Sequence, residues 1–312
     1  MGIARWLLGD HNKVEVSLQA FCLIIVNYMD SIADLRTWLF VPGDDARKLA
    51  RCRNFPADTL VLDWEDSVLP NDKESARRRT SETSAAFSGD LLFFVRINGI
   101  HSPWFKDDIN ALAVAKPGGI VLPKCESAAD VREVIQFLER VPGWDCRVCP
   151  IIESPAGLLE AANIASASER VIALAFGAED FCAATEIRRT AGEQELLFAR
   201  SALVVAAKAR GLAAIDSPTL VLDDLEKLRE DALRSLHLGF TGKLVIHPKH
   251  LPIVADAFTP NAEEVQEAQE LLNRASIEPA GVFRWRGRMV DEPLLEQARR
   301  IVSRFRTPTR EI

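Results

Sequence analysis

The sequence has no excess of positive charge. Its 38 lysine and arginine residues are outnumbered by 45 aspartate and glutamate residues, which gives a formal net charge of −7. A surface that binds nucleic acid or an anionic membrane normally carries a basic patch. We therefore expect neither partner, although an acidic enzyme still accommodates an anionic substrate in a locally basic pocket.

Cysteine is also scarce, with six residues in a chain of 312. That number is too small for a disulfide framework in a chain of this length, so we expect a reducing compartment and a cytoplasmic protein. Cys146 and Cys149 form a single C-x-x-C motif with no second pair and no histidine cluster after it. We expect Cys149 to pack inside a strand rather than to bind zinc or to take part in redox chemistry.

Long apolar stretches are missing as well. The run AFCLIIV at 20–26 is far too short to span a bilayer. Asp10 and Glu15 precede it and no small-residue cleavage site follows it, which argues against a signal peptide. The globular pattern begins at Met29. We expect Met29 to be the natural start and residues 1–28 to be an extension.

What the sequence does contain is a regular alternation of strand and helix patterns. Short runs rich in β-branched and aromatic residues recur eight times, at 37–41, 59–63, 91–97, 119–123, 147–153, 171–177, 213–217 and 243–247. Helical patterns lie between them, and this order predicts parallel strands joined by right-handed crossovers. Eight such units predict a TIM barrel. A doubly wound open sheet is the alternative, which is less favoured because no G-x-G-x-x-G follows the first strand.

A further segment follows the eighth unit. Residues 260–275 predict one more helix, and 278–305 predict a hairpin-like turn followed by an amphipathic helix. This segment is too small to fold as an independent domain, so we expect it to dock on the barrel or on a neighbouring subunit. We assign residues 29–275 to the barrel and 276–312 to a C-terminal segment.

Polar side chains gather at the ends of the predicted strands, where the catalytic groups of TIM barrels lie. They are Asp63 (with Glu65 and Asp66), Arg96, Lys124, Glu153, Asp180, Asp216 and His247. Carboxylates this close need a cation between them, or one must hold a proton. Oxygen ligands without histidine or thiolate suit Mg²⁺ or Mn²⁺. Glu153 and Asp180 end consecutive strands, and we expect these two to share one ion.

Each of these residues also has a plainer explanation. Asp180 is typical of the first turn of a helix, where the helix dipole favours an acid. Four others suit structural ion pairs or a hydrogen-bonded turn, namely Arg96, Lys124, Asp216 and His247. The spacing of residues does not by itself name a reaction.

A set of motifs identifies a family resemblance between about Arg36 and Ile301. In order they read RTWLFVPGDDARKLAR, LVLDWEDSV, FVRING, GIVLPKCES, IIESPAGLLEAANIA, ALAFGAEDF, GKLVIHPKHLPIVADAF and GRMVDEPLLEQARR. With these motifs the chain resembles the citrate lyase β-subunit-like CoA-ester lyases, a group within the HpcH/HpaI aldolase superfamily that includes malyl-CoA and citramalyl-CoA lyases. The motifs are specific for the superfamily and much less so for the substrate.

The resemblance implies a TIM barrel of the phosphoenolpyruvate/pyruvate-domain type, a homotrimer or hexamer, and a C-terminal lid at 276–312. It implies that Glu153 and Asp180 bind Mg²⁺, and that Arg96 contacts the oxo acid and the developing enolate oxygen. Asp291 resembles the lid residue that handles the proton on the acetyl-CoA carbon, and such a lid commonly closes over a neighbour's site. Further residues resemble contacts of the CoA phosphates (Arg36, Lys48) or supports of the binding residues (Asp63, Glu65, Asp66, Lys124).

The expected activity is Mg²⁺-dependent cleavage, or formation, of a 3-hydroxyacyl-CoA such as malyl-CoA or citramalyl-CoA, with acetyl-CoA and a 2-oxo acid as the other partners. The alternatives are a citrate lyase β subunit that acts on a citryl thioester, a pyruvate-type aldolase that does not use CoA, and a non-catalytic acyl-CoA binder. The sequence departs from the family pattern at Arg286 before the glycine turn of the lid. It also departs at His101 and Trp104, which we expect to reshape the acid pocket.

Overall fold

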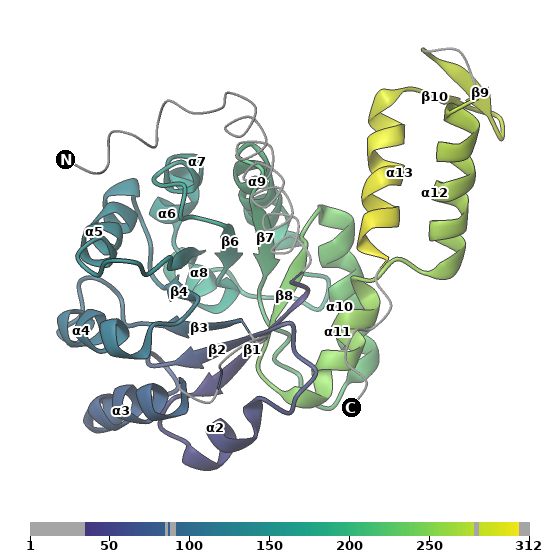
Figure 1. Ribbon diagram of the computed structural model, residues 1–312. Helices are drawn as coiled ribbons and strands as arrows, with labels where there is room; N and C mark the ends of the chain where they lie inside the picture. Colours follow the sequence, from purple (N-terminus) through teal and green to yellow (C-terminus); the bar gives the residue numbers. More distant parts are fainter. Residues whose placement is uncertain (1–34, 85–86, 88–91, 278–280, 306–312) are drawn as a thin grey trace, which may run out of the picture.

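The computed structural model describes residues 35–84, 87, 92–277 and 281–305. Eight parallel strands close into a barrel in chain order (Figure 1). They are β1 (Thr37–Pro42), β2 (Thr59–Asp63), β3 (Phe93–Arg96), β4 (Gly119–Leu122), β5 (Arg147–Ile152), β6 (Ala173–Phe176), β7 (Ala213–Asp216) and β8 (Gly242–Val245). Every predicted run forms one strand, so the TIM barrel is confirmed over the open sheet.

The interior of the barrel explains why the runs are apolar on both faces. Large side chains on one side, such as Trp38 and Phe94 with ring centroids 4.8 Å apart, pack against small ones such as Ala173, Ala175 and Ala213 on the other. Alternation of large and small residues fills the interior without voids. The outward faces of the same strands pack against the surrounding helices, which accounts for the continuous hydrophobic runs.

Helices follow the strands and cover the barrel (Figure 1). They are α2 (Ala46–Cys52), α3 (Lys73–Ser84), α4 (Phe105–Ala115), α5 (Ala128–Leu138), α6 (Pro155–Leu159), α7 (Ala161–Ala165), α8 (Ala178–Thr185), α9 (Leu197–Lys208), α10 (Leu225–Leu238) and α11 (Leu251–Ala257). Short 3₁₀ turns lie at Pro70–Asp72, Gln194–Leu196 and Pro248–His250. No helix in the described part of the chain is long and apolar enough to cross a membrane.

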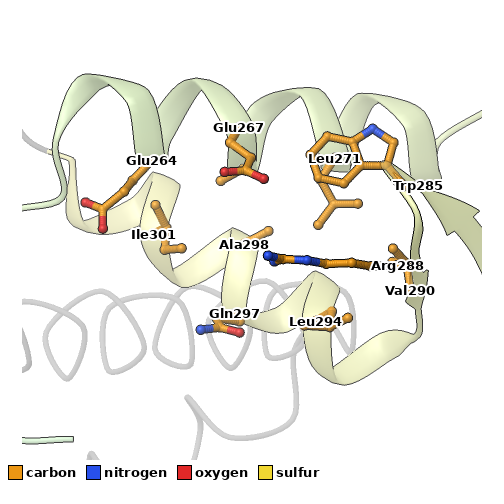
Figure 2. A pocket seen from close by; sticks show the side chains of 11 residues that line it. Glu264, Glu267, Leu271, Trp285, Arg288, Val290, Leu294, Gln297, Ala298 and Ile301 are labelled. Atoms are coloured by element: carbon orange, nitrogen blue, oxygen red, sulfur yellow. The ribbon is translucent and has the colours of Figure 1, made fainter. Parts of the chain in front are cut away.

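A helical hairpin stands apart from the barrel after α11 (Figure 1). It consists of α12 (Ala262–Ala275), the two-stranded ribbon β9 (Phe283–Trp285) and β10 (Arg288–Val290), and α13 (Glu292–Arg304). The side chains of α12 and α13 form their own small apolar core, and Figure 2 shows part of it around Leu271 and Ile301. Because α12 packs on α13, the appended unit begins near Ala262 rather than at the predicted boundary after residue 275.

Two further sequence predictions concern the N-terminal extension and the C-x-x-C pair. Met29 and the 1–28 extension lie outside the described residues. Cys146 and Cys149 are both buried free thiols, and Cys149 lies within β5 with its side chain in the barrel interior, as expected for a packing residue.

Candidate active site

The carboxyl ends of β2 and β3 bring Asp63 and Arg96 together. The two residues are opposite each other in the strand register. The Arg96 guanidinium donates from Nε to Oδ1 and from Nη2 to Oδ2 of Asp63, both at 2.6 Å. Its Nη1 lies 3.0 Å from Glu65 Oε2, and its Cζ lies over the ring of Phe40, 4.8 Å from the ring centre. These contacts fix the guanidinium at the rim of the barrel.

Burial and ion pairing shift the pKa values of Asp63 and Glu65 in opposite directions. Burial by itself would raise the pKa of Asp63, but Arg96 outweighs it and holds that pKa below its usual value. For Glu65 burial dominates, and its pKa is raised in spite of Arg96 and Lys124. Asp63 is therefore a fixed anion, whereas Glu65 takes up a proton more readily.

Lys124, two residues after the end of β4, links this group to Glu153. Its backbone adopts the left-handed conformation with φ 52°, which costs a non-glycine residue about 1–2 kcal/mol. In this conformation its N–H donates to Glu153 Oε1 at 2.6 Å, while its Nζ pairs with Glu65. One strained residue therefore orients two carboxylates, as is common at functional sites.

Glu153 lies where β5 passes into α6, and it is only 7% exposed. Ser154 caps α6 by accepting from the Gly157 N–H at 3.1 Å, and Pro155 takes the first helical position. Burial raises the pKa of Glu153 to about 8. The Lys124 N–H opposes the shift, and the charges of Glu65 and Asp180 add to it. A cation shared with Asp180 would relieve the cost of keeping Glu153 ionised.

Asp180 reaches the same cleft from the first turn of α8. The cleft has a volume of about 690 Å³, and Glu65, Lys124, Glu153, Asp180 and Trp104 are among its lining residues. In the described part of the chain, no three His, Cys, Asp or Glu residues are grouped so that protein atoms alone would hold a metal. Two carboxylates with room for water and substrate oxygens fit Mg²⁺, which usually keeps several non-protein ligands.

Arg36 is at the opposite end of the barrel. It precedes β1, its N–H donates to Asp58 Oδ2 at 2.9 Å, and its guanidinium donates to Thr259 beyond α11. The length of a strand separates this end from the cleft. Within one chain Arg36 therefore lies away from the cleft, and its contact with CoA phosphates stays a prediction.

Two other predicted residues lie away from the cleft lining. Lys48 is exposed on α2, with Nζ 3.6 Å from Asp45 Oδ2. Asp291 belongs to the appended hairpin, where its Oδ1 caps α13 by accepting from the Leu294 N–H at 3.4 Å. Their roles toward CoA and toward the substrate carbon stay predictions.

Asp216 and His247 have structural roles: Asp216 is in an ion pair and His247 is in a hydrogen-bonded turn. Asp216 is buried on the outer side of β7, where it pairs with Arg200 and with Lys243 Nζ at 3.2 Å. His247 accepts from the Lys249 N–H at 3.2 Å through Nδ1, as a turn residue does. Neither side chain lines the cleft.

The sequence analysis did not predict three supporting side chains, those of Lys73, Asn98 and Asp108. Lys73 Nζ donates to the carbonyl oxygens of Trp64 and Glu65, both at 2.7 Å. Asn98 Nδ2 donates to the Trp64 carbonyl at 3.0 Å and to Asp108 Oδ2 at 2.7 Å. These contacts hold the loop after β2. The bond from Asn98 to Trp64 joins two strand–helix units 34 residues apart, so no local spacing marks it.

The family model of the HpcH/HpaI aldolase/citrate lyase proteins matches residues 36–248, which is more than half of the chain. The chain belongs to this family. Citrate lyase subunit beta-like protein of Deinococcus radiodurans is 36% identical over 282 residues, which cover 86% of this chain and 96% of that protein. L-malyl-CoA/beta-methylmalyl-CoA lyase of Rhodobacter capsulatus is 36% identical over 296 residues, which cover 86% and 93% of the two chains.

A solved structure of an HpcH/HpaI relative extends the comparison to three dimensions. Protein CitE of Mycobacterium tuberculosis, in complex with magnesium, acetoacetate and coenzyme A, is 31% identical and has a TM-score of 0.74. The alignment covers 86% of this chain and 97% of that one. The resemblance read from the motifs is thereby confirmed, and the chain is a carbon–carbon lyase of the HpcH/HpaI family.

Proposed function

We propose that the protein is a Mg²⁺-dependent lyase that cleaves a 3-hydroxyacyl-CoA such as malyl-CoA or citramalyl-CoA into acetyl-CoA and a 2-oxo acid. The observation that carries the proposal is the buried Glu153 carboxylate, which lines the same cleft as Asp180, a cleft large enough for a small hydroxy acid. Two relatives support the ligand class, because one is named as a malyl-CoA lyase and the other was solved with magnesium and coenzyme A.

Glu153 and Asp180 are the residues that would hold the ion. When bound, Mg²⁺ supplies Lewis-acid stabilisation to the oxygens of the hydroxy acid. The Lys124 N–H fixes the direction of the Glu153 carboxylate, so one oxygen of Glu153 stays available to the cleft. Burial of Glu153 keeps competing water from screening this pair.

Arg96 is the cation that would stabilise the developing charge in this proposal. Cleavage of the carbon–carbon bond leaves an electron pair on the thioester product, and the negative charge moves to its oxygen. A preorganised guanidinium lowers the energy of that charge. Nε and Nη2 are held by Asp63, so the donor that can turn to the substrate is Nη1, which now faces Glu65 at 3.0 Å. Protonation of Glu65 would loosen that contact.

Asp291 is proposed to deliver the proton to the enolate carbon from a neighbouring subunit. Within one chain it caps α13 on the appended hairpin, and it is absent from the cleft lining. A second copy, in the predicted homotrimer or hexamer, would have to bring this lid over the cleft and exclude water. Oligomer size and the cytoplasmic location remain predictions.

His101 and Trp104 form part of the cleft wall and are proposed to select the oxo acid. The Trp104 ring is held by Lys73, whose Nζ lies 5.1 Å from the ring centre. A bulky, fixed ring at this position limits the size of the acid that fits beside the ion.

The first experiment is a cleavage assay with malyl-CoA and citramalyl-CoA side by side, following acetyl-CoA and the oxo acid. Release of acetyl-CoA that EDTA and Glu153→Ala both abolish would support the lyase proposal, and the preferred thioester would identify the acid pocket. Binding of acetyl-CoA without turnover of either substrate would favour a different acid or a non-catalytic acyl-CoA binder. Turnover of a free hydroxy-oxo acid without CoA would favour an aldolase.

The position of Asp291 calls for a mixing experiment. Glu153→Ala and Asp291→Ala variants are each expected to be inactive. Unfolded and refolded together, they should regain part of the activity if Asp291 acts on a neighbour's cleft, because mixed oligomers contain some sites with both residues intact. Activity that stays absent in mixed oligomers would place Asp291 in its own chain's site or outside the reaction.

A further inference from the structure

The turn between β6 and α8 lies directly against Glu153. A Cβ atom built on Gly177 would come within 2.4 Å of Glu153 Oε2 and 2.5 Å of its Cβ, so the absence of a side chain leaves the space that the carboxylate occupies. The Gly177 N–H donates to the Ile152 carbonyl oxygen at 3.1 Å, which ties the turn to the end of β5. Asp180 follows three residues later, in the first turn of α8.

Ser217 fixes this turn from the next strand. It comes directly after β7 and is buried. Its hydroxyl donates to the Phe176 carbonyl oxygen at 2.7 Å and accepts from the Ala178 N–H at 2.9 Å. One hydroxyl therefore bonds to the residue before Gly177 and to the residue after it, which defines the path of the turn.

Ser217 supplies a hydrogen-bond acceptor that the N-terminus of α8 otherwise lacks. The N-cap residue of α8 is Gly177, which has no side chain to accept from the free N–H groups of the first turn. The Ser217 hydroxyl, which follows a different strand, accepts from the Ala178 N–H in place of an N-cap side chain. Ser217 is itself held in place, because the preceding Asp216 is locked by Arg200 and Lys243.

We propose that Ser217 is a positioning residue for the metal site: its hydroxyl holds the Phe176–Ala178 turn against Glu153 and so sets Asp180 at the distance from Glu153 that one divalent cation requires. This inference rests on the proposed function, since it assigns the same two carboxylates to the ion. Partners behind metal ligands typically change metal affinity by about 10-fold to 100-fold when they are removed. We expect a loss in that range for Ser217→Ala.

The test measures binding of Mn²⁺ alone, by electron paramagnetic resonance titration with Mg²⁺ as the competitor, on the full chain without substrate. Ser217→Ala should weaken Mn²⁺ binding, and Ser217→Thr should restore it because threonine keeps the hydroxyl. Thr241→Val is the matched control: Thr241 is buried, and its hydroxyl donates to the Ala214 carbonyl oxygen at 3.2 Å at the other end of the barrel. This control should lower the unfolding temperature but leave Mn²⁺ affinity unchanged.

Gly177→Ala provides a second test if Ser217→Ala does not fold. The backbone of Gly177, with φ −105° and ψ 87°, is open to alanine, so the variant changes mainly the contact with Glu153. It should also weaken Mn²⁺ binding. Wild-type Mn²⁺ affinity in either folded variant would overturn the inference, as would equal losses in Ser217→Ala and Thr241→Val. A wild-type chain whose Mn²⁺ binding equals that of Glu153→Ala would instead overturn the proposed metal site itself, and with it this role.

Discussion

Replacement of Glu153 by glutamine should stabilise the metal-free protein at neutral pH. Burial raises the pKa of Glu153 from 4.5 to about 8 in the folded chain. Each unit of difference between the folded and unfolded pKa corresponds to 1.36 kcal/mol once the group is ionised in the unfolded state. At pH 7 the unfolded chain has released this proton and the folded chain has mostly kept it, so ionisation favours the unfolded state by about 3 kcal/mol. Glutamine removes that term and can still accept from the Lys124 N–H.

The sign of the pH dependence follows from the raised pKa of an acid. Below pH 4.5 Glu153 is protonated in both the folded and the unfolded chain, so its ionisation does not affect the free energy of unfolding. Between pH 4.5 and about 8 the penalty grows, and above that range it is constant. Urea unfolding in EDTA across this range, for wild type and Glu153→Gln, should give a stability difference that is small in acid and largest at alkaline pH. Glu133→Gln, at an exposed position of α5, serves as the control for the substitution itself.

Mg²⁺ should reverse the order of stability. Because the ion binds the ionised carboxylate, saturating Mg²⁺ stabilises wild type and leaves Glu153→Gln nearly unchanged. Apparent Mg²⁺ affinity should rise about tenfold per pH unit below pH 8, since one proton must leave for each ion bound. A Glu153→Gln variant that is less stable than wild type at pH 7 in EDTA, or equally stable at every pH, would refute this reasoning.

Three further predictions concern stability and thiol chemistry. Arg96→Gln should lower the free energy of unfolding by about 3–5 kcal/mol at pH 7, because Asp63 and Glu65 lose their buried counter-charge; urea unfolding measures it, and wild-type stability would contradict it. Lys124→Gly should be more stable than Lys124→Ala by about 1 kcal/mol, because glycine adopts the left-handed backbone at φ 52° without strain; an alanine variant as stable as the glycine variant would count against a strained turn. In a Cys22→Ser variant the remaining thiols should not react with a disulfide reagent at pH 8 until the chain unfolds. Burial raises the pKa of Cys52 to about 11 and that of Cys125 to about 12. Rapid labelling of the folded variant would show that the thiols are accessible.

Most of the fold could be predicted from the sequence. The strands are buried on both faces, so each leaves a continuous apolar run that local composition reveals, and the alternation with helices fixes the parallel order. The candidate ligands could be predicted for the same reason: a polar residue that ends an apolar run, or lies in the first turn of the helix after it, is at the carboxyl rim of the barrel. Glu153 and Asp180 both lie there.

What only the tertiary structure decided is which of these residues meet. The pairing of Arg96 with Asp63, the turn of Lys124 toward Glu153 and the hydroxyl of Ser217 across β6 and α8 all join different strand–helix units. Such contacts depend on barrel closure and strand register, which leave no mark on local spacing. For the same reason the sequence did not indicate that the Arg36 guanidinium, next to β1 in the chain, donates to Thr259 beyond α11. The sequence by itself determined the barrel and its rim; closure of the barrel determined the geometry between residues on that rim.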